Sequence, residues 1–240
     1  MKTRRWASFV IGIDEVGRGA LAGPVTVAAV CLPESLIIRN PRLGILRDSK
    51  KLSPLQREKW FAYFRNQPAL CYSIARVYPR GIEQLNITKA ANRAASIAFE
   101  RLIKSFQSSQ QHTNKLEFVG MFKIFLDGGL YLGNKRGLTR KFQRLSASSQ
   151  RWSAITVIRG DEKIAAVAIA SIIAKVSRDG YMKRLSKKYP RYGFEVHKGY
   201  GTKKHFRAIR QHGASPAHRL TFLDFLKSSK QKRENFSRKS

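Results

Sequence analysis

The chain has few acidic residues, few cysteines and no long apolar run. Only 15 of its 240 residues are Asp or Glu, against 47 Lys and Arg, which gives a formal net charge of +32 at pH 7. So large an imbalance needs a polyanionic partner or an environment that screens self-repulsion, and it favours nucleic acid as the partner. Solubility, or the general amino-acid usage of the organism, is the alternative source of this charge.

The shortage of apolar runs and of cysteines argues against two further classes of protein. No apolar run approaches the roughly 20 residues of a membrane-spanning helix, and the basic start of the chain meets acids too early for a secretory signal. We therefore expect a cytoplasmic protein without a membrane partner. The only two cysteines, Cys31 and Cys71, lie in apolar surroundings, which is typical of buried thiols and not of a disulfide framework or a zinc site.

Short apolar runs alternate with helical patterns, and 42% of the residues are apolar, enough for a substantial core. Strands are expected over residues 8–14, 25–32, 70–77, 121–127 and 152–158, and helices over 53–65, 88–106 and 163–189. This interleaving indicates an α/β fold. The short connection between the first two strands indicates some antiparallel pairing, and therefore a mixed sheet.

Three of the six aspartates follow predicted strands. Asp14 and Glu15 end the first strand, Asp127 ends another, and Asp161 comes after a third strand and a glycine. A rigid sheet fixes the groups at its strand ends, so these acids are candidates for one site. Converging carboxylates repel one another unless protons or cations neutralise them, and oxygen ligands favour Mg²⁺ or Mn²⁺ over zinc. Two such ions would suit the hydrolysis of a phosphodiester.

Each of these acids also has an ordinary structural explanation. Asp14 and Glu15 would then be turn residues that pair with Arg18. Asp127, before two glycines, would be a turn aspartate. Asp161 would be only the N-cap of the helix that follows it.

A glycine-rich loop, Gly17-Arg18-Gly19, follows the first two acids. Glycines let backbone amides approach a ligand closely, and an arginine among them can bind phosphate through two hydrogen bonds. The loop therefore predicts contact with a nucleic-acid backbone beside the acids, although such glycines often only permit a turn.

Five segments, in order along the chain, resemble type 2 ribonuclease H, specifically the bacterial ribonuclease HII family. They read GIDEVGRGALAGPV, LRDSKKLS, LDGG, GDEKIAAVAIASIIAKVSRD and YPRYGFEVHKGYGTKKH, and they extend from about residue 10 to residue 220. The resemblance implies a ribonuclease H-like α/β fold, with a mixed β-sheet flanked by helices and a C-terminal helical region. It also implies metal-dependent endonucleolytic hydrolysis of RNA in RNA–DNA hybrids. The same family incises duplex DNA 5′ of a single ribonucleotide, leaving 3′-hydroxyl and 5′-phosphate ends.

The resemblance assigns the acids residue by residue. The family's catalytic acids match Asp14, Glu15, Asp127 and Asp161. The first three would be the principal ligands of Mn²⁺ or Mg²⁺, with two ions expected when substrate is bound, and Asp161 would complete the cluster. Asp179 lies some 27 Å further along the predicted helix if that helix is straight, so it is interpreted as a structural acid that pairs with a basic neighbour.

The resemblance also assigns residues to the substrate. The loop Gly17-Arg18-Gly19 would sense the ribose 2′-hydroxyl, the group that distinguishes RNA from DNA, and the adjacent phosphate. Tyr200 would pack against the sugar after the ribonucleotide; a half-buried structural tyrosine is the alternative. A segment that borders the site would contact phosphates through Ser49, Lys50 and Lys51, with a solvated charged turn as the alternative.

The expected division of the chain combines composition with the resemblance. Residues 1–190 would form the catalytic domain, 191–226 a C-terminal helical cap that contributes to substrate binding, and 227–240 a basic, disordered tail. Residues 107–114 and 131–150 are interpreted as surface insertions, the second longer than the bacterial family usually carries.

The expected partners are RNA–DNA hybrids and DNA duplexes that contain ribonucleotides, bound by a monomer. His197 and His205 are expected on the surface, because the acid cluster does not require a histidine base. Two alternatives remain open: a basic nucleic-acid-binding protein without catalysis, and the related type 3 ribonuclease H, against which the Gly-Arg-Gly loop argues.

Overall fold

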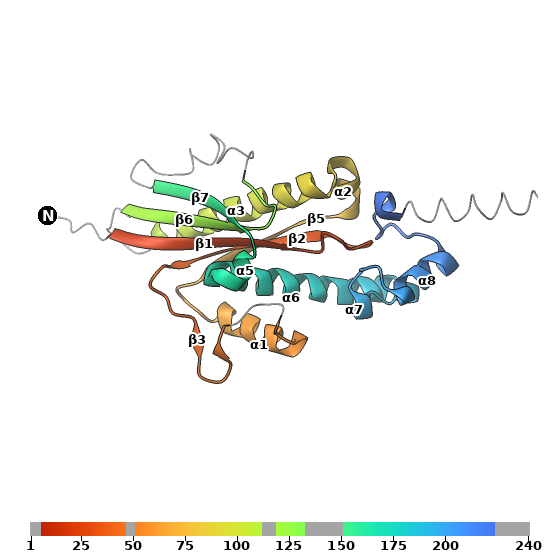
Figure 1. The fold of residues 1–240 in the computed structure, drawn as a ribbon, viewed down its shortest axis with the longest axis horizontal. Coiled ribbons are helices and arrows are strands. Elements are labelled where there is room, and N and C mark those ends of the chain that lie inside the picture. Colours follow the sequence, from red (N-terminus) through yellow and green to blue (C-terminus); the bar gives the residue numbers. More distant parts are fainter. Residues whose placement is uncertain (1–5, 47–50, 112–118, 133–150, 224–240) are drawn as a thin grey trace, which may run out of the picture.

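A five-stranded mixed sheet runs through the middle of the molecule (Figure 1). The computed structural model describes residues 6–46, 51–111, 119–132 and 151–223. The strands stand in the order β5-β2-β1-β6-β7, and their bounds are Trp6–Val16 for β1, Val25–Pro33 for β2, Cys71–Val77 for β5, Val119–Asp127 for β6 and Arg151–Val157 for β7. β1 pairs antiparallel with β2 and parallel with β6, which in turn pairs parallel with β7. The sheet is therefore mixed, as the sequence predicts.

The parallel pairing of β1 with β6 brings two acid-bearing strand ends together. The register places Ile13 opposite Leu126, one residue before Asp14 and Asp127. Because the carboxyl ends of parallel strands meet at the same edge of a sheet, residues far apart in sequence become neighbours there.

Helices cover both faces of the sheet (Figure 1). On one face lies α3, Ile87–Gln111, whose alanines and large apolar residues pack against β1, β2 and β6. On the other face lie α6, Ala165–Lys188, and α1, Pro54–Arg65. A Cβ on Gly12 would stand 2.1 Å from the backbone carbon of Ala166, so α6 crosses β1 with almost no space between the two backbones. This close crossing holds the start of α6 beside the end of β1.

Shorter elements complete the described structure. They are β3 (Arg39–Asn40), β4 (Gly44–Ile45), α2 (Pro79–Leu85), α5 (Gly160–Lys163), η2 (Pro190–Tyr192), α7 (Phe194–His197), α8 (Lys203–His212) and η3 (Leu220–Leu223). The last four pack around a third core cluster, which includes Phe194 and Ile209 and reaches Met182 on α6 and Leu21 after β1. The C-terminal helical region is thus joined to the segment that follows the first strand.

Most predicted elements are present, and the helix expected over 163–189 is confirmed as α6, which the extended backbone of Ile164 separates from the short α5. Two expectations are corrected. Residues 107–111, expected in a surface insertion, are the last turns of α3. Cys31 is buried as expected, but Cys71, opposite it on the edge strand β5, is only partly buried. None of the described helices is long and apolar enough to cross a bilayer.

Two further expectations concern residues that the structure does not describe. The basic tail expected over 227–240 and nearly all of the insertion expected over 131–150 lie outside the described residues. The boundary expected near residue 190 stays a prediction.

Candidate active site

Four acids line one small pocket where β1 and β6 end. The pocket has a volume of about 130 Å³, and its walls are Asp14, Glu15, Val16, Asp127, Asp161, Ser171 and Lys175. β1 contributes the first two acids and β6 the third, while α5 contributes the fourth. We call this site, defined by Asp14, Glu15, Asp127 and Asp161, the acid pocket.

Local contacts hold the carboxylates in place. Oδ1 of Asp14 accepts a hydrogen bond from the Glu15 amide at 2.7 Å, and the Ser171 side chain hydrogen-bonds to the same carboxylate. Oδ1 of Asp127 accepts from the Gly160 amide at 2.6 Å, which ties the end of β6 to the start of α5. Asp14 is only 5% exposed and Asp161 only 3%. Asp161 lies within α5, while Ile164 is the N-cap of α6, so Asp161 is not the cap of the long helix.

Glu15 has an incomplete set of partners. Its Oε1 pairs with a guanidinium nitrogen of Arg18 at 3.0 Å, which is the ion pair that the structural explanation expected. Its Oε2 is buried and has no hydrogen-bond partner among the residues that the structure describes. A buried carboxylate oxygen without a partner is costly, so this atom is suited to a ligand that supplies positive charge.

The surroundings of the acid pocket disfavour the ionised form of its carboxyl groups. Burial raises the pKa of Asp14 well above its ordinary value, and the neighbouring charges of Glu15 and Asp127 raise it further. Burial also raises the pKa of Glu15, although the charge of Arg18 opposes this shift. A cation placed among these groups would relieve both the burial cost and the mutual repulsion.

The donor set fits a hard divalent cation. The pocket offers carboxylate oxygens and a hydroxyl, without sulfur or imidazole, and such donors suit Mg²⁺ or Mn²⁺. Across the described ranges, no three acids or histidines are arranged as a preformed metal-binding group. One oxygen of Glu15 is engaged with Arg18 and one oxygen of Asp127 with Gly160.

The loop Gly17–Gly19, which we call the glycine loop, borders the acid pocket. Gly17 has a φ of +88°, which favours glycine, and a Cβ there would stand 2.2 Å from Nε of Arg178. Gly19 has open space where a side chain would be, and Arg18 is partly exposed above Glu15. The loop thus presents backbone to a ligand on one side and rests on a buried arginine on the other.

Tyr200 lies in a neighbouring groove of about 320 Å³, which we call the tyrosine groove. The groove is formed by α1, α6 and the segment after α7, and its basic residues are Arg57, Lys175, Lys183 and Lys198. Lys175 also lines the acid pocket, so the two depressions adjoin. Tyr200 is 39% exposed. Asp179 lines this groove and not the acid pocket, so it lies apart from the four acids.

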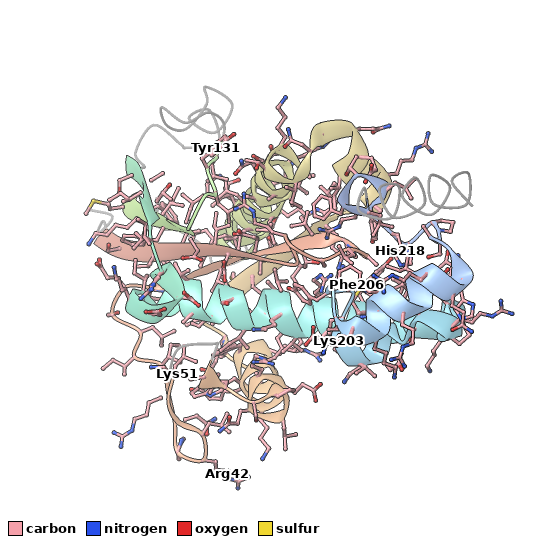
Figure 2. The ribbon with its side chains drawn as sticks, turned by 45° about the vertical axis from the view of Figure 1, so that its right-hand side comes forward. Arg42, Lys51, Tyr131, Lys203, Phe206 and His218 are labelled. Carbon is pink, nitrogen blue, oxygen red and sulfur yellow. The ribbon has the colours of Figure 1, made fainter. Side chains whose placement is uncertain are left out.

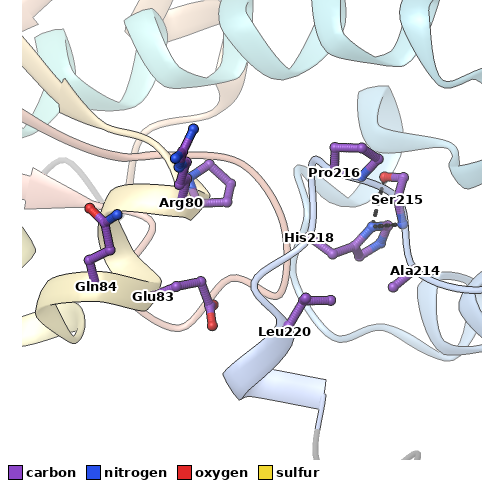
Figure 3. A pocket seen from close by; sticks show the side chains of 9 residues that line it. Arg80, Glu83, Gln84, Ala214, Ser215, Pro216, His218 and Leu220 are labelled. Carbon is purple, nitrogen blue, oxygen red and sulfur yellow. Dashed lines mark hydrogen bonds between the residues drawn. The ribbon is translucent and has the colours of Figure 1, made fainter.

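The other predicted substrate residues are only partly described. Ser49 and Lys50 lie outside the described residues, and Lys51 is exposed just before α1 (Figure 2). A further pocket of about 470 Å³ lies between α2 and residues 214–220 (Figure 3). Its one acid, Glu83, accepts hydrogen bonds from Thr221.

The expectation that His197 and His205 lie on the surface is wrong. Both are buried, their rings stack at 4.2 Å between centroids, and His205 meets His218 at 3.1 Å between Nε2 atoms. The outer nitrogens are satisfied by Tyr192 O, the Gly199 amide, Tyr200 O and the Ser215 amide. Burial is tolerated because neutral imidazoles with complete hydrogen bonds carry little cost.

Sequence reasoning missed the residues that support the site. Ser171 and Lys175 are one helical turn apart on α6, and both line the acid pocket. Their separation by four residues on a predicted helix, which places them on one face, was the available signal. Arg178 and Arg219 are fully buried behind the glycine loop, and no local pattern indicates this.

Comparisons with known proteins agree with the geometry. Residues 11–225 match the family model of ribonuclease HII. The ribonuclease HII of Endomicrobium trichonymphae is 40% identical over 215 residues, which cover 89% of this chain and 84% of that one. The enzyme of Caldicellulosiruptor bescii is 39% identical over 90% and 86% of the two chains. The structure of ribonuclease H2 from Pyrococcus horikoshii superimposes with a TM-score of 0.62 at 27% identity, over 89% of this chain and 93% of that one. The chain is thus a ribonuclease H, and it belongs to the ribonuclease HII family.

Proposed function

We propose that this chain incises duplex DNA on the 5′ side of a single embedded ribonucleotide and leaves 3′-hydroxyl and 5′-phosphate ends. Membership of the ribonuclease HII family gives it endonucleolytic cleavage of RNA in RNA–DNA hybrids. The observation that supports the finer reaction is the adjacency of three features: the acid pocket, the glycine loop and the tyrosine groove.

The acids divide the chemical work. Asp14, Glu15 and Asp127 would hold Mn²⁺ or Mg²⁺, two ions with substrate bound, and Asp161 would complete the cluster. Such ions, when bound, lower the pKa of water and stabilise the leaving oxygen. The Ser171 side chain and the Gly160 amide orient two of the carboxylates. Arg18 compensates the charge of Glu15 at the rim, where it is also placed to bind a phosphate.

The sugar is read on two sides. The glycine loop presents backbone groups beside the acid pocket, where they would bond to the ribose 2′-hydroxyl. Tyr200 presents an exposed ring in the adjoining groove, where a 2′-hydroxyl on the next sugar would crowd it. The helical segment over 191–226 would thereby contribute to substrate binding. We expect the chain to act as a cytoplasmic monomer on hybrids and on duplexes that contain ribonucleotides.

The test uses the purified full chain with Mg²⁺ or Mn²⁺ and three duplexes: all DNA, DNA with one ribonucleotide, and an RNA–DNA hybrid. We expect one incision 5′ of the ribonucleotide, cleavage of the hybrid, and none of the all-DNA duplex. Asp14→Asn should abolish both cleavages. Glu34→Gln, which changes an exposed acid beside Ser8 near the start of β1, should leave them unchanged.

Two outcomes would contradict the proposal. If the wild-type chain cleaves the hybrid but not the single-ribonucleotide duplex, the finer reaction is wrong. If Asp14→Asn cuts as fast as wild type, the acid pocket is not the active site. Tight binding with a steep salt dependence and no cleavage would instead indicate a purely electrostatic binder.

A further inference from the structure

Two buried arginines, Arg178 and Arg219, lie directly behind the glycine loop. Both side chains are 0% exposed. In the part of the chain that the structure describes, neither guanidinium forms an ion pair. Burying an unpaired cation is costly, so its hydrogen bonds must compensate. We call these two residues the arginine pair.

Backbone carbonyls take the place of the missing carboxylates. Arg178 donates to Pro24 O at 3.0 Å, Ala22 O at 3.2 Å and Lys198 O at 2.9 Å. Arg219 donates to Gly17 O and Arg18 O, both at 2.7 Å, and to Gly23 O at 3.0 and 2.9 Å. A guanidinium can do this because it has five donors in a rigid planar fork.

These carbonyls belong to three segments: the glycine loop, the turn before β2 and the segment before Tyr200. Arg219 holds the glycine loop from behind and also holds Gly23 in the turn before β2. Arg178 holds that same turn and also Lys198, two residues before Tyr200. The guanidinium carbon of Arg178 is 5.3 Å from the centroid of the Tyr200 ring. The arginine pair therefore joins the glycine loop to the tyrosine segment through a shared turn.

Further contacts make this junction stiff. The amides of Leu21 and Ala22 donate to Gly199 O, and the Gly23 amide donates to Ala217 O. A Cβ on Gly199 would stand 2.4 Å from Ala22 O, so the two segments are in direct backbone contact. Few alternative arrangements of the loop keep all of these bonds.

We infer that Arg178 and Arg219 are positioning residues that set 2′-hydroxyl discrimination by fixing the glycine loop at one distance from Tyr200. The inference rests on the proposed function, because discrimination is meaningful only if the glycine loop and Tyr200 read the sugar. A preorganised pair of contacts is selective because the loop has no freedom to adapt to a sugar that lacks the hydroxyl.

The test measures a preference and not a rate alone. Binding of a one-ribonucleotide duplex and of the matching all-DNA duplex is compared in Ca²⁺, and incision of the first is followed in Mg²⁺. The variants are Arg178→Lys and Arg219→Lys, since lysine keeps the charge but not the fork. We expect each to reduce the preference for the ribonucleotide at least tenfold through weaker binding of that duplex, with affinity for all-DNA duplex changed less than threefold.

Leu102→Ala is the matched control. Leu102 is buried on α3, on the face of the sheet away from α6, and its truncation lowers the melting temperature without touching the loop. It should keep the wild-type preference at a temperature where it is folded. If both lysine variants are folded and keep that preference, the inference is wrong.

A measurement on the wild-type chain covers the case in which the variants unfold. Without substrate, amide hydrogen exchange of Leu21, Ala22 and Gly23, whose amides donate to Gly199 O and Ala217 O, should be as slow as that of residues 198–200, and the ribonucleotide duplex should slow it little further. Fast exchange of these three amides that substrate suppresses would overturn the inference. A wild-type chain with no preference for the ribonucleotide would instead contradict the proposed function.

Discussion

The acid pocket and the arginine pair are both buried clusters of like charge, and they differ in how that charge is satisfied. In the acid pocket, no residue in the described part of the chain hydrogen-bonds to Oε2 of Glu15, and the pKa values of Asp14 and Glu15 are raised. In the arginine pair, seven hydrogen bonds to backbone carbonyls engage the guanidinium groups. The first cluster is incomplete without a cation, which suits catalysis. The second is complete within the protein, which suits positioning.

Burial and the neighbouring charge of Arg178 together lower the pKa of Arg219 to about 9. Arg178 and Arg219 thus repel each other, as the carboxylates do. The carbonyl dipoles offset this repulsion within the folded chain. The two clusters should therefore respond to substitution in opposite ways.

The largest effect is expected from Asp127→Asn. The amide oxygen can still accept from Gly160, but the charge is lost, so incision should fall at least about a thousandfold through loss of several kcal/mol of transition-state stabilisation. The free energy of unfolding, measured by urea titration without divalent metal, should not fall, because repulsion with Asp14 and Glu15 is relieved. A large loss of stability would show that the charge of Asp127 stabilises the folded chain even without a metal ion.

Arg219→Met should have the opposite effect on stability: it should lower the free energy of unfolding, which Asp127→Asn should not. It leaves the carbonyls of Gly17, Arg18 and Gly23 without their donor, so the free energy of unfolding should fall by about 3 kcal/mol or more. Urea titration of Arg219→Met and of Asp127→Asn under the same conditions compares their free energies of unfolding directly. Equal stability of the two variants would remove the distinction between the clusters.

His197, His205 and His218 form a third buried cluster of ionisable groups, and this one is buried in the neutral state. Burial lowers the pKa of His205 and of His218 to about 4, below the ordinary value of 6.5. The unfolded chain therefore binds more protons between pH 6.5 and pH 4. Stability should decrease as the pH falls through that window, by about 1.4 kcal/mol per pH unit for each extra proton bound on unfolding.

His205→Gln isolates the histidine contribution from that of the acids. The raised pKa values of Asp14 and Glu15 act in the opposite sense, so the informative quantity is the difference between variants. The slope of melting temperature between pH 6.5 and pH 4.5 should be shallower in His205→Gln than in wild type. His212→Gln, at an exposed histidine, should keep the wild-type slope. Identical slopes in all three proteins would show that the buried cluster does not titrate in this window.

The smallest effect is expected from Lys183→Gln in the tyrosine groove. Lys183 pairs with Glu58 at 3.2 Å, and both side chains are more than half exposed, so stability should change by less than about 1 kcal/mol. Binding of a duplex should weaken only a few-fold, with a shallower dependence on salt. If Lys183→Gln lowered the rate of incision as much as Asp127→Asn does, Lys183 would take part in the catalytic step.

Local pattern was enough to predict the main strands and the candidate acids. The run that ends at Asp14 is apolar because β1 packs against both core clusters, whereas β6, which ends at Asp127, buries one face through Phe122, Ile124 and Leu126. The capped start of α1 was equally visible, with Ser53 accepting from Gln56 and Pro54 in the first turn. The long helix α6 begins and ends within two residues of its expected bounds. The short α5 before it was not predicted, because four residues are too few to show helical spacing.

The remaining features depend on residues distant in sequence. Arg219 is about 200 residues from the carbonyls that it holds, and the histidines are buried by contacts with one another. Arginine is rarely fully buried and histidine is only intermediate, so residue type alone does not predict the burial of these side chains.

The sequence by itself determined the α/β class, the basic charge and the identity of the acids at the strand ends, because these follow from hydrophobic runs and from residue chemistry. Only the tertiary structure decided that the parallel pairing of β1 with β6 gathers the acids into one pocket. It also decided that two buried arginines join the glycine loop to Tyr200. The physical reason is that an unpaired buried charge is tolerated only where distant parts of the chain supply its partners.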